Sequence, residues 1–248
     1  PRRCIRSPTT PPWKALGPPG LHSRLLSRDP ETGARTALQC MRPQEGYVAP
    51  SIAHFHRTYE ELLVVHGRFS FDSVHWLVPR SYCFHPPETV HGFKSAVPEE
   101  SWFLSRVGRD LDVNLVPEPE QLSPYYVCAE PPRRAVVASP EPEREFGWRA
   151  VEVGTPPVAA AICVLSRDPQ DGEGSVLLRL PAGAHCAARL PLASYVEFFV
   201  LEGGLTAASG EHIGFGGYGF LPPGKTFEPW VAPQGAVLYV TSGQPIEA

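Results

Sequence analysis

The chain has 248 residues, of which 42% are hydrophobic and 10% aromatic, so it can bury a substantial core and is not a disordered polypeptide. Lys and Arg number 22 against 26 for Asp and Glu, and a net charge of −4 without a long charge run gives no electrostatic reason to expect binding to nucleic acid or to an anionic membrane. The 30 prolines and 22 glycines break helices and favour turn-rich β structure.

The N-terminus, the longest apolar run and the cysteines indicate the cellular compartment. The N-terminus lacks the apolar core of a secretory signal, and the longest apolar run, residues 158–165, is far shorter than the roughly 20 residues that span a bilayer. The 6 cysteines are scattered without a CxxC pair, which argues against a thiolate zinc site and against a disulfide framework. We therefore expect a cytoplasmic protein without a membrane partner.

Short apolar runs follow one another along the chain. Each is rich in β-branched or aromatic residues and is bounded by Gly, Pro or charged turns, a pattern typical of β-strands. These runs predict strands over residues 62–65, 69–71, 74–78, 102–107 and 198–201. Many short strands with frequent turns indicate a sandwich or a small barrel, which can enclose a small ligand.

An internal repeat divides the chain. The sequence Leu-Ser-Arg-Asp-Pro occurs at residues 26–30 and again at 165–169, and a Pro-Pro pair recurs at 86–87 and 222–223. A repeat longer than about 100 residues is a duplicated domain rather than a solenoid unit. We therefore predict an N-terminal extension over 1–20, a first domain over 21–130 and a second over 136–245.

Histidines concentrate in the first repeat. Six of the 9 lie between residues 54 and 91, whereas the second repeat has two. His54 and His56 are two apart, so on a strand both imidazoles point to the same face. Glu60 opens the next apolar run, and His91 follows the Pro86-Pro87 turn. Three imidazoles and a carboxylate are suited to a first-row transition metal with room for water or substrate.

These residues resemble the first cupin motif. His54-x-His56, Glu60 and then Gly67 match its pattern HxH-x(3,4)-E-x(6)-G at each of those positions, and Pro86 through His91 resembles the second motif, P-x-G-x-x-H. The resemblance extends over both repeats and implies an all-β bicupin, with two tandem double-stranded β-helix (jelly-roll) barrels. The sequence is similar to bacterial cupins that are related to the cupin domain of zinc-binding anti-sigma factors.

The match departs from the motifs at turn positions. Glu88 stands where the second motif usually has Gly, and Arg80 and Val48 stand at two further positions where the family has Gly. These departures leave the ligand assignment unchanged and concern the shape of the loops. The metal ligands that the resemblance implies are His54, His56, Glu60 and His91.

The second repeat lacks most of this set. Aligning the repeats places the four residues Pro191, Ala193, Glu197 and Phe227 opposite His54, His56, Glu60 and His91. A carboxylate without imidazole partners is a poor transition-metal site. The second cupin is therefore predicted to be metal-free and structural.

Other polar residues near the motifs have simpler interpretations. His66 and His75 are expected at the surface, and His85 is expected to support a ligand from outside the coordination sphere. Glu61 should face away from Glu60 by strand alternation. Cys83 is expected to be a buried, inert thiol.

Three functions remain open, because the cupin fold does not fix the reaction. The favoured one is an iron-dependent dioxygenase or related oxidoreductase acting on a small organic molecule, with one divalent metal; iron is preferred to zinc, manganese, nickel or copper. The second is a non-redox metal-dependent isomerase, lyase or hydrolase. The third is a metal or small-molecule sensor. No catalytic residue beyond the ligands can be named, and pairing of two copies is expected to cover edge strands.

Overall fold

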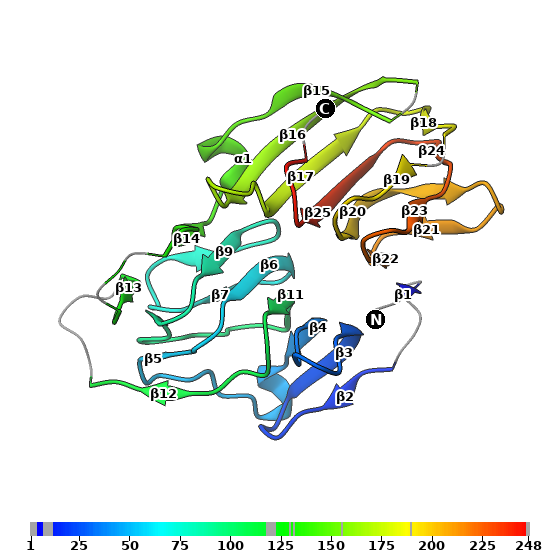
Figure 1. The fold of residues 1–248 in the computed structure, drawn as a ribbon. Helices are drawn as coiled ribbons and strands as arrows, with labels where there is room; N and C mark the ends of the chain where they lie inside the picture. The colour runs from blue at the N-terminus through cyan, green and yellow to red at the C-terminus, as the bar shows by residue number, and fades with distance from the viewer. Residues whose placement is uncertain are drawn as a thin grey trace. The chain divides into compact units, whose positions relative to one another are not determined.

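The computed structural model describes residues 4–6, 12–117, 123–128, 130, 132–154, 156–188 and 190–246. Strands dominate it: within those residues the helices are the single turn α1 (Pro142–Glu145) and the 3-10 turn η1 (Pro43–Glu45) (Figure 1). In this part of the chain, no helix has the length and apolar character needed to cross a membrane. The expectation of an all-β fold is confirmed.

The chain forms two compact units, residues 11–142 and residues 143–248, the latter joined by the N-terminal ten residues. Two strands explain these bounds. β14 (Val137–Ser139) pairs with β9 (Tyr82–His85), so the first barrel includes residues that sequence assigned to the second domain. β1 (Cys4–Arg6) pairs with β22 (Tyr218–Leu221) in the second barrel, although it lies in the stretch predicted as an extension.

The first barrel is built on a seven-stranded antiparallel sheet in the order β14-β9-β6-β11-β4-β3-β2. Its remaining strands are β2 (Lys14–Ala15), β3 (Leu21–Arg28), β4 (Arg35–Met41), β6 (Glu60–His66) and β11 (Ser101–Val107). Three two-stranded ribbons accompany it, namely β5 (His54–Phe55) with β12 (Asn114–Leu115), β10 (Thr89–Val90) with β13 (Tyr125–Tyr126), and β7 (Phe69–Ser70) with β8 (Trp76–Leu77).

The second barrel repeats this plan in a larger sheet, with the order β1-β22-β20-β25-β17-β16-β15 along its main path. Its strands are β15 (Arg149–Val153), β16 (Val158–Arg167), β17 (Gly174–Leu180), β20 (Val196–Ala207) and β25 (Ala236–Ser242). The shorter ones are β18 (Ala184–Cys186), β19 (Leu190–Pro191), β21 (His212–Gly214), β23 (Thr226–Phe227) and β24 (Trp230–Ala232). Each predicted apolar run contributes to a strand.

Both barrels bury clusters of apolar side chains. In the first barrel, one cluster of buried apolar residues includes Leu62, Val64 and Cys83, and another includes Val90 and Phe93. In the second barrel one larger cluster runs through the interior and includes residues from β16, β17, β20 and β25. Each barrel therefore has an apolar interior.

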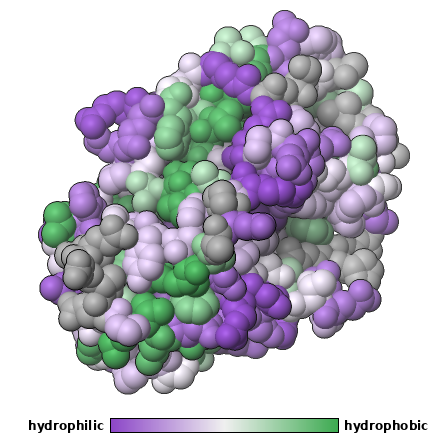
Figure 2. Space-filling model, turned by 60° about the vertical axis from the view of Figure 1, so that its left-hand side comes forward, coloured by the Kyte–Doolittle hydropathy of each residue, from purple (hydrophilic) through white to green (hydrophobic). Residues whose placement is uncertain are grey.

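Apolar side chains also reach the surface of the first barrel. Val74, Val113, Leu115 and Val127 are exposed by 43 to 65% of their surface. Figure 2 shows apolar residues as separate green patches among hydrophilic ones. Scattered exposure of this kind is ordinary for a folded protein.

Candidate metal centre

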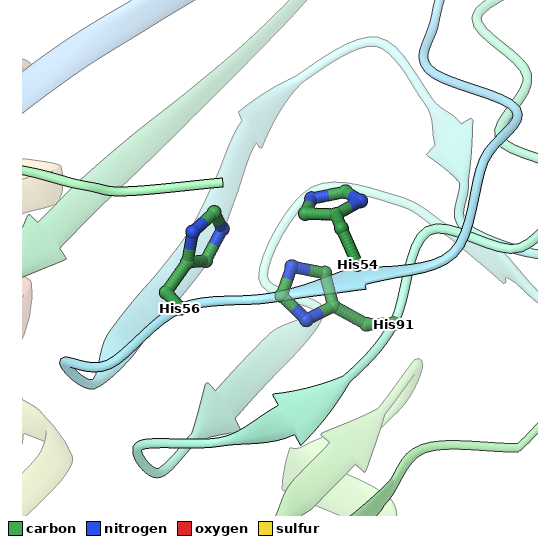
Figure 3. A group of neighbouring side chains, drawn as sticks. All are labelled: His54, His56 and His91. Carbon is green, nitrogen blue, oxygen red and sulfur yellow. The ribbon is translucent and has the colours of Figure 1, made fainter. Parts of the chain in front are cut away.

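His54 and His56 come from one extended segment and point to the same side of it. Strand β5 begins at His54, and alternation turns Phe55 the other way, where it packs against the Val90 cluster. The imidazoles of His54 and His56 have centroids 5.1 Å apart (Figure 3). The expected shared face of the HxH pair is present.

The Pro86 turn brings His91 against this pair. His54 and His91 form an antiparallel bridge. Each backbone N–H donates to the carbonyl of the other residue, with nitrogen-to-oxygen distances of 3.0 and 2.9 Å. The His91 ring centroid lies 4.7 Å from that of His54 and 5.2 Å from that of His56. Three imidazoles from two neighbouring segments therefore converge (Figure 3).

The turn keeps its shape without its usual glycine. Glu88 takes a left-handed φ of 63°, a conformation that glycine adopts most easily. Its N–H donates to the His56 carbonyl, and the Thr89 hydroxyl donates to the Pro86 carbonyl. Arg80, which also stands where the motif has Gly, has a positive φ of 75°, whereas Val48 is not among the residues with positive φ. At Glu88 and Arg80 the residue type thus departs from the motif while the left-handed backbone conformation is present.

Glu60 provides the carboxylate. Its Oε2 lies 3.3 Å from His91 Nε2 and 3.9 Å from His56 Nε2. Burial by itself would raise the pKa of Glu60, but its contacts with the imidazoles of His91, His56 and His85 outweigh burial and lower this pKa to about 2. Glu60 is therefore a carboxylate at neutral pH.

Backbone carbonyls orient all three rings. His54 Nδ1 donates to the Ile52 carbonyl and His91 Nδ1 to the Thr89 carbonyl, each at 3.0 Å, and His56 Nδ1 donates to the Asp112 carbonyl. A carbonyl only accepts, so each Nδ1 carries a proton and each Nε2 can offer its lone pair. This arrangement is typical of histidines that bind metals. Burial and the neighbouring His91 lower the pKa of His54, which favours its neutral, ligating form.

These groups fit a metal ion. Ligand atoms of His54, His56 and His91 lie within 4.8 Å of one another, and the same holds for Glu60, His85 and His91. Nitrogen and carboxylate donors of this kind suit iron, manganese, zinc, nickel or copper. The first barrel thus carries a histidine-rich candidate metal site.

His85 belongs to this site more closely than the sequence predicted. It pairs with Glu60 across β9 and β6, and its ring stacks on His91 with centroids 4.4 Å apart. Burial and the neighbouring His91 lower the pKa of His85 to about 3, so its ring is neutral. The signal that could have found it is register, because a residue opposite Glu60 faces the same side of the sheet.

The other sequence candidates lie elsewhere. His66 is exposed at a strand end, with its ring centroid 5.5 Å from that of Trp102. His75 is exposed, and its Nδ1 donates to Asp72 at 2.6 Å. Neither belongs to the ligand groups found among the described residues.

Glu61 points to the opposite face of the sheet from Glu60. It is 1% exposed and forms ion pairs with Arg106 and Arg134, both at 2.9 Å. The Tyr82 hydroxyl donates to Glu61 at 2.5 Å. Glu61 is therefore part of a buried structural network.

Strand register corrects the alignment of the two repeats. Glu61 is opposite Phe84 and Glu197 is opposite Phe220, and each carboxylate accepts a hydrogen bond from a tyrosine, Tyr82 or Tyr218. Glu197 is thus the counterpart of Glu61, not of Glu60 as the sequence alignment had it. The one-residue slip matters because it moves a side chain to the other face of a sheet.

The same register extends through the whole site. The His54–His91 bridge corresponds to the Leu190–Phe227 pair, and Glu88 N–H to His56 O corresponds to Gly224 N–H to Leu192 O. Residues that stand in place of His54, His56, Glu60, His85 and His91 are therefore Leu190, Leu192, Val196, Leu221 and Phe227. The second barrel has an apolar residue at every one of these positions.

Comparisons with known proteins agree with this architecture. Residues 2–108 match the family model of the ChrR cupin-like domain. No curated protein sequence matches the chain. A candidate dioxygenase from Nostoc punctiforme is 16% identical with a TM-score of 0.72, over 92% of this chain and 75% of its own.

Two further solved structures are enzymes by name. Salicylate 1,2-dioxygenase from Pseudaminobacter salicylatoxidans is 12% identical with a TM-score of 0.55, over 89% of this chain and 76% of its own. An oxalate decarboxylase variant from Bacillus subtilis is 12% identical with a TM-score of 0.55, over 99% of this chain and 78% of its own. At such identities the similarity establishes the fold.

Proposed function

We propose that the first barrel, which carries most of the match to the ChrR cupin-like domain over residues 2–108, is a metal-dependent oxidoreductase of the dioxygenase type. Its substrate is a small organic molecule. The observation that carries the proposal is the convergence of three imidazoles, each with Nδ1 bonded to a backbone carbonyl, beside the Glu60 carboxylate.

The residues have distinct tasks in this proposal. His54, His56 and His91 hold the metal through Nε2, and Glu60 contributes one negative charge. Iron held there would supply redox chemistry with molecular oxygen, and positions left open by four protein ligands would admit oxygen and substrate. The backbone carbonyls keep the rings from rotating, and burial of His56 and His91 limits access of water.

Two observations support oxygen chemistry and iron. Three neutral imidazoles and one carboxylate leave a divalent ion with net positive charge and suit a metal that changes oxidation state. Two proteins of similar fold are named as dioxygenases or candidate dioxygenases. The preference for iron over zinc, manganese, nickel and copper remains part of the proposal.

The test begins with the metal content of protein purified without chelators or a histidine tag. We expect near-stoichiometric iron and oxygen uptake with a panel of small organic substrates. His54→Leu and His91→Phe, which introduce the residues of the second barrel, should lose both. His66→Glu is the matched control, because Glu202 stands at the corresponding position.

A non-redox activity is the second candidate, and similarity in fold to an oxalate decarboxylase favours it. It predicts bound zinc or manganese and turnover without oxygen. A metal sensor, to which the ChrR match points, predicts bound metal without turnover of any panel compound. Absence of metal in the parent protein, with variants of unchanged stability, would overturn all three.

A further inference from the structure

The three rings of the candidate metal centre are not oriented in the same way. The carbonyls that accept from His54 and His91 each lie two residues earlier in the same segment as the histidine. The carbonyl that accepts from His56 Nδ1 belongs to Asp112, which lies 56 residues further along the chain. The orientation of His56 therefore depends on a second segment, whereas local backbone geometry sets that of the other two rings.

This second segment is the β11–β12 loop, residues 108–113. Hydrogen bonds fix the loop to the backbone on both sides of the ligand histidine. Asn114 Nδ2, at the start of β12, donates to the Phe55 carbonyl at 3.2 Å. The Arg109 guanidinium donates to the Arg57 carbonyl. The loop therefore contacts the residue before the ligand and the residue after it.

The Asp112 carboxylate is the centre of these contacts. Its Oδ1 accepts from the Arg57 backbone N–H at 2.9 Å, and its Oδ2 accepts from Arg57 Nη1 at 3.1 Å and from Asn114 Nδ2 at 2.7 Å. We call these three hydrogen bonds the Asp112 clasp. Hydrogen bonds to an ionised acceptor are stronger than those between neutral groups. One side chain thus connects the loop, β12 and the segment that carries His56.

The second barrel cannot form the clasp in this way. Leu192 stands in place of His56, so Ala193 stands in place of Arg57. The alanine methyl group cannot donate a hydrogen bond to a carboxylate. The guanidinium that pairs with Asp112 is therefore found in the barrel that has the histidines.

From these contacts we infer that Asp112 is a positioning residue of the metal centre. Its carboxylate holds the β11–β12 loop against the segment of His56, and its carbonyl then keeps the proton on His56 Nδ1, which leaves Nε2 available to the metal. The inference rests on the proposed function, because that function needs His56 as a ligand. Residues that orient a metal-binding histidine typically contribute about 10- to 100-fold to metal affinity.

The test compares Asp112→Ala with Asp110→Ala. Asp110 is the matched control, because it lies in the same loop but accepts from Arg28 at 2.9 Å and from Arg35 at 2.6 Å, outside the segment of His56. Competition with a chromophoric chelator measures the dissociation constant for zinc. We expect it to rise about tenfold for Asp112→Ala and to stay unchanged for Asp110→Ala. Equal constants for the two variants would overturn the role of Asp112.

The protonation of the His56 ring separates positioning from a purely structural role. Two-bond ¹H–¹⁵N correlation spectra of the metal-free protein at about pH 8, where histidine is neutral, report which ring nitrogen carries the proton. We expect the Nδ1–H form in the parent and in Asp110→Ala, and a mixture of both forms in Asp112→Ala. The visible absorption of the cobalt-loaded protein should change in Asp112→Ala alone. An unchanged ring and an unchanged cobalt spectrum would overturn the inference.

Two further variants test the clasp itself. Asp112→Asn keeps one oxygen that can accept the Arg57 backbone N–H, so it should recover part of the lost zinc affinity. Arg57→Ala removes the guanidinium and leaves the backbone bond, so it should weaken zinc binding by a smaller factor than Asp112→Ala. It also provides the test if Asp112→Ala does not fold, and parental zinc affinity in Arg57→Ala would then count against the clasp.

The two proposals can fail separately. Equal zinc affinity in the parent and in Asp112→Ala would overturn this inference and leave the proposed function standing. A parent protein that bound neither zinc nor cobalt would overturn both.

Discussion

The two barrels share strand order and register but differ in what fills the interior. In the first, Cys83 and His85 face a cavity. In the second, Gly219 stands in place of Cys83, and a Cβ there would lie 2.3 Å from the Phe198 ring. Phe198 in turn contacts Phe227, which replaces His91, with ring centroids 6.0 Å apart. Aromatic rings therefore occupy in one barrel the space that the other leaves open beside its histidines.

One buried feature is common to both barrels. Glu61 and Glu197 are each 1% exposed, and each accepts a hydrogen bond from a buried tyrosine at 2.5 Å. The carboxylate on the outer face of this strand has thus been kept in a barrel with no ligand residues. The two adjacent glutamates of the first barrel therefore have separate roles: Glu61 is structural, and Glu60 lies in the candidate metal site.

The largest effect on stability is expected when Glu61, the structural glutamate, is replaced. Glu61→Leu leaves Arg106 and Arg134 buried without their carboxylate, so we expect a loss of about 3 to 5 kcal/mol in the free energy of unfolding. Glu60→Val, the residue of the second barrel, should instead reduce metal content at little cost in stability. Urea unfolding and metal analysis of both variants measure this.

An exposed ion pair provides the control for the previous prediction. Glu45 pairs with Arg42 at the surface, where solvent screens the ion pair, so Glu45→Leu should change the free energy of unfolding only slightly. If Glu61→Leu were no more destabilising than Glu45→Leu, the buried network would not be structural.

Because aromatic rings fill the interior of the second barrel, truncating one of them should lower the stability of the protein strongly. Phe198→Ala should cost about 3 to 5 kcal/mol, since it opens a void among Gly219, Phe227 and their neighbours. Phe71→Ala in the first barrel should cost less, because one side of Phe71 already faces the cavity. Thermal unfolding of the two variants compares them, and equal losses would contradict the difference in packing.

The site should also make the first barrel sensitive to acid. The pKa of His85 is lowered from 6.5 to about 3 in the folded protein, so the unfolded chain takes up this proton first as pH falls. The contribution of neutral His85 to the free energy of unfolding is fully present above pH 6.5. It is lost as the pH falls from 6.5 towards 3. In metal-free protein this loss should reach about 2 kcal/mol between pH 7 and pH 5.

His85→Leu isolates that effect, because leucine does not titrate. Urea unfolding of the metal-free parent and of the variant at both pH values should show a shallower pH dependence for the variant. The carboxylate of Glu60 contributes little in this window, since its pKa lies lower in both states: 4.5 unfolded and about 2 folded. A pH dependence that the variant shares in full would argue against a buried neutral His85.

The smallest effect concerns the turn that carries His91. Glu88 has a φ of 63°, whereas the corresponding residue of the second barrel is Gly224 with a φ of 75°. Glu88→Gly should relieve this strain and stabilise the protein by about 0.5 to 1 kcal/mol, with unchanged metal content. Destabilisation in thermal unfolding would mean that the Glu88 side chain contributes more than its backbone costs.

The fold and the convergence of His54, His56, Glu60 and His91 could be predicted from the sequence alone. Short apolar runs between turns indicated strands, and the duplicated segment indicated two barrels. The spacing of His54, His56 and Glu60 predicted their convergence because side chains two apart on a strand share a face. The turn after Pro86 predicted that His91 would join them. These inferences succeeded because they depend on local periodicity.

Tertiary structure decided what depends on register and on contacts between distant segments. A sequence alignment could match Glu197 with either of two adjacent glutamates, and only the pairing of β20 with β22 and β25 assigns it to the face of Glu61. His85 became a member of the site through its pairing with Glu60. The cavity joins side chains from residues 71 to 140, a grouping that no local pattern encodes.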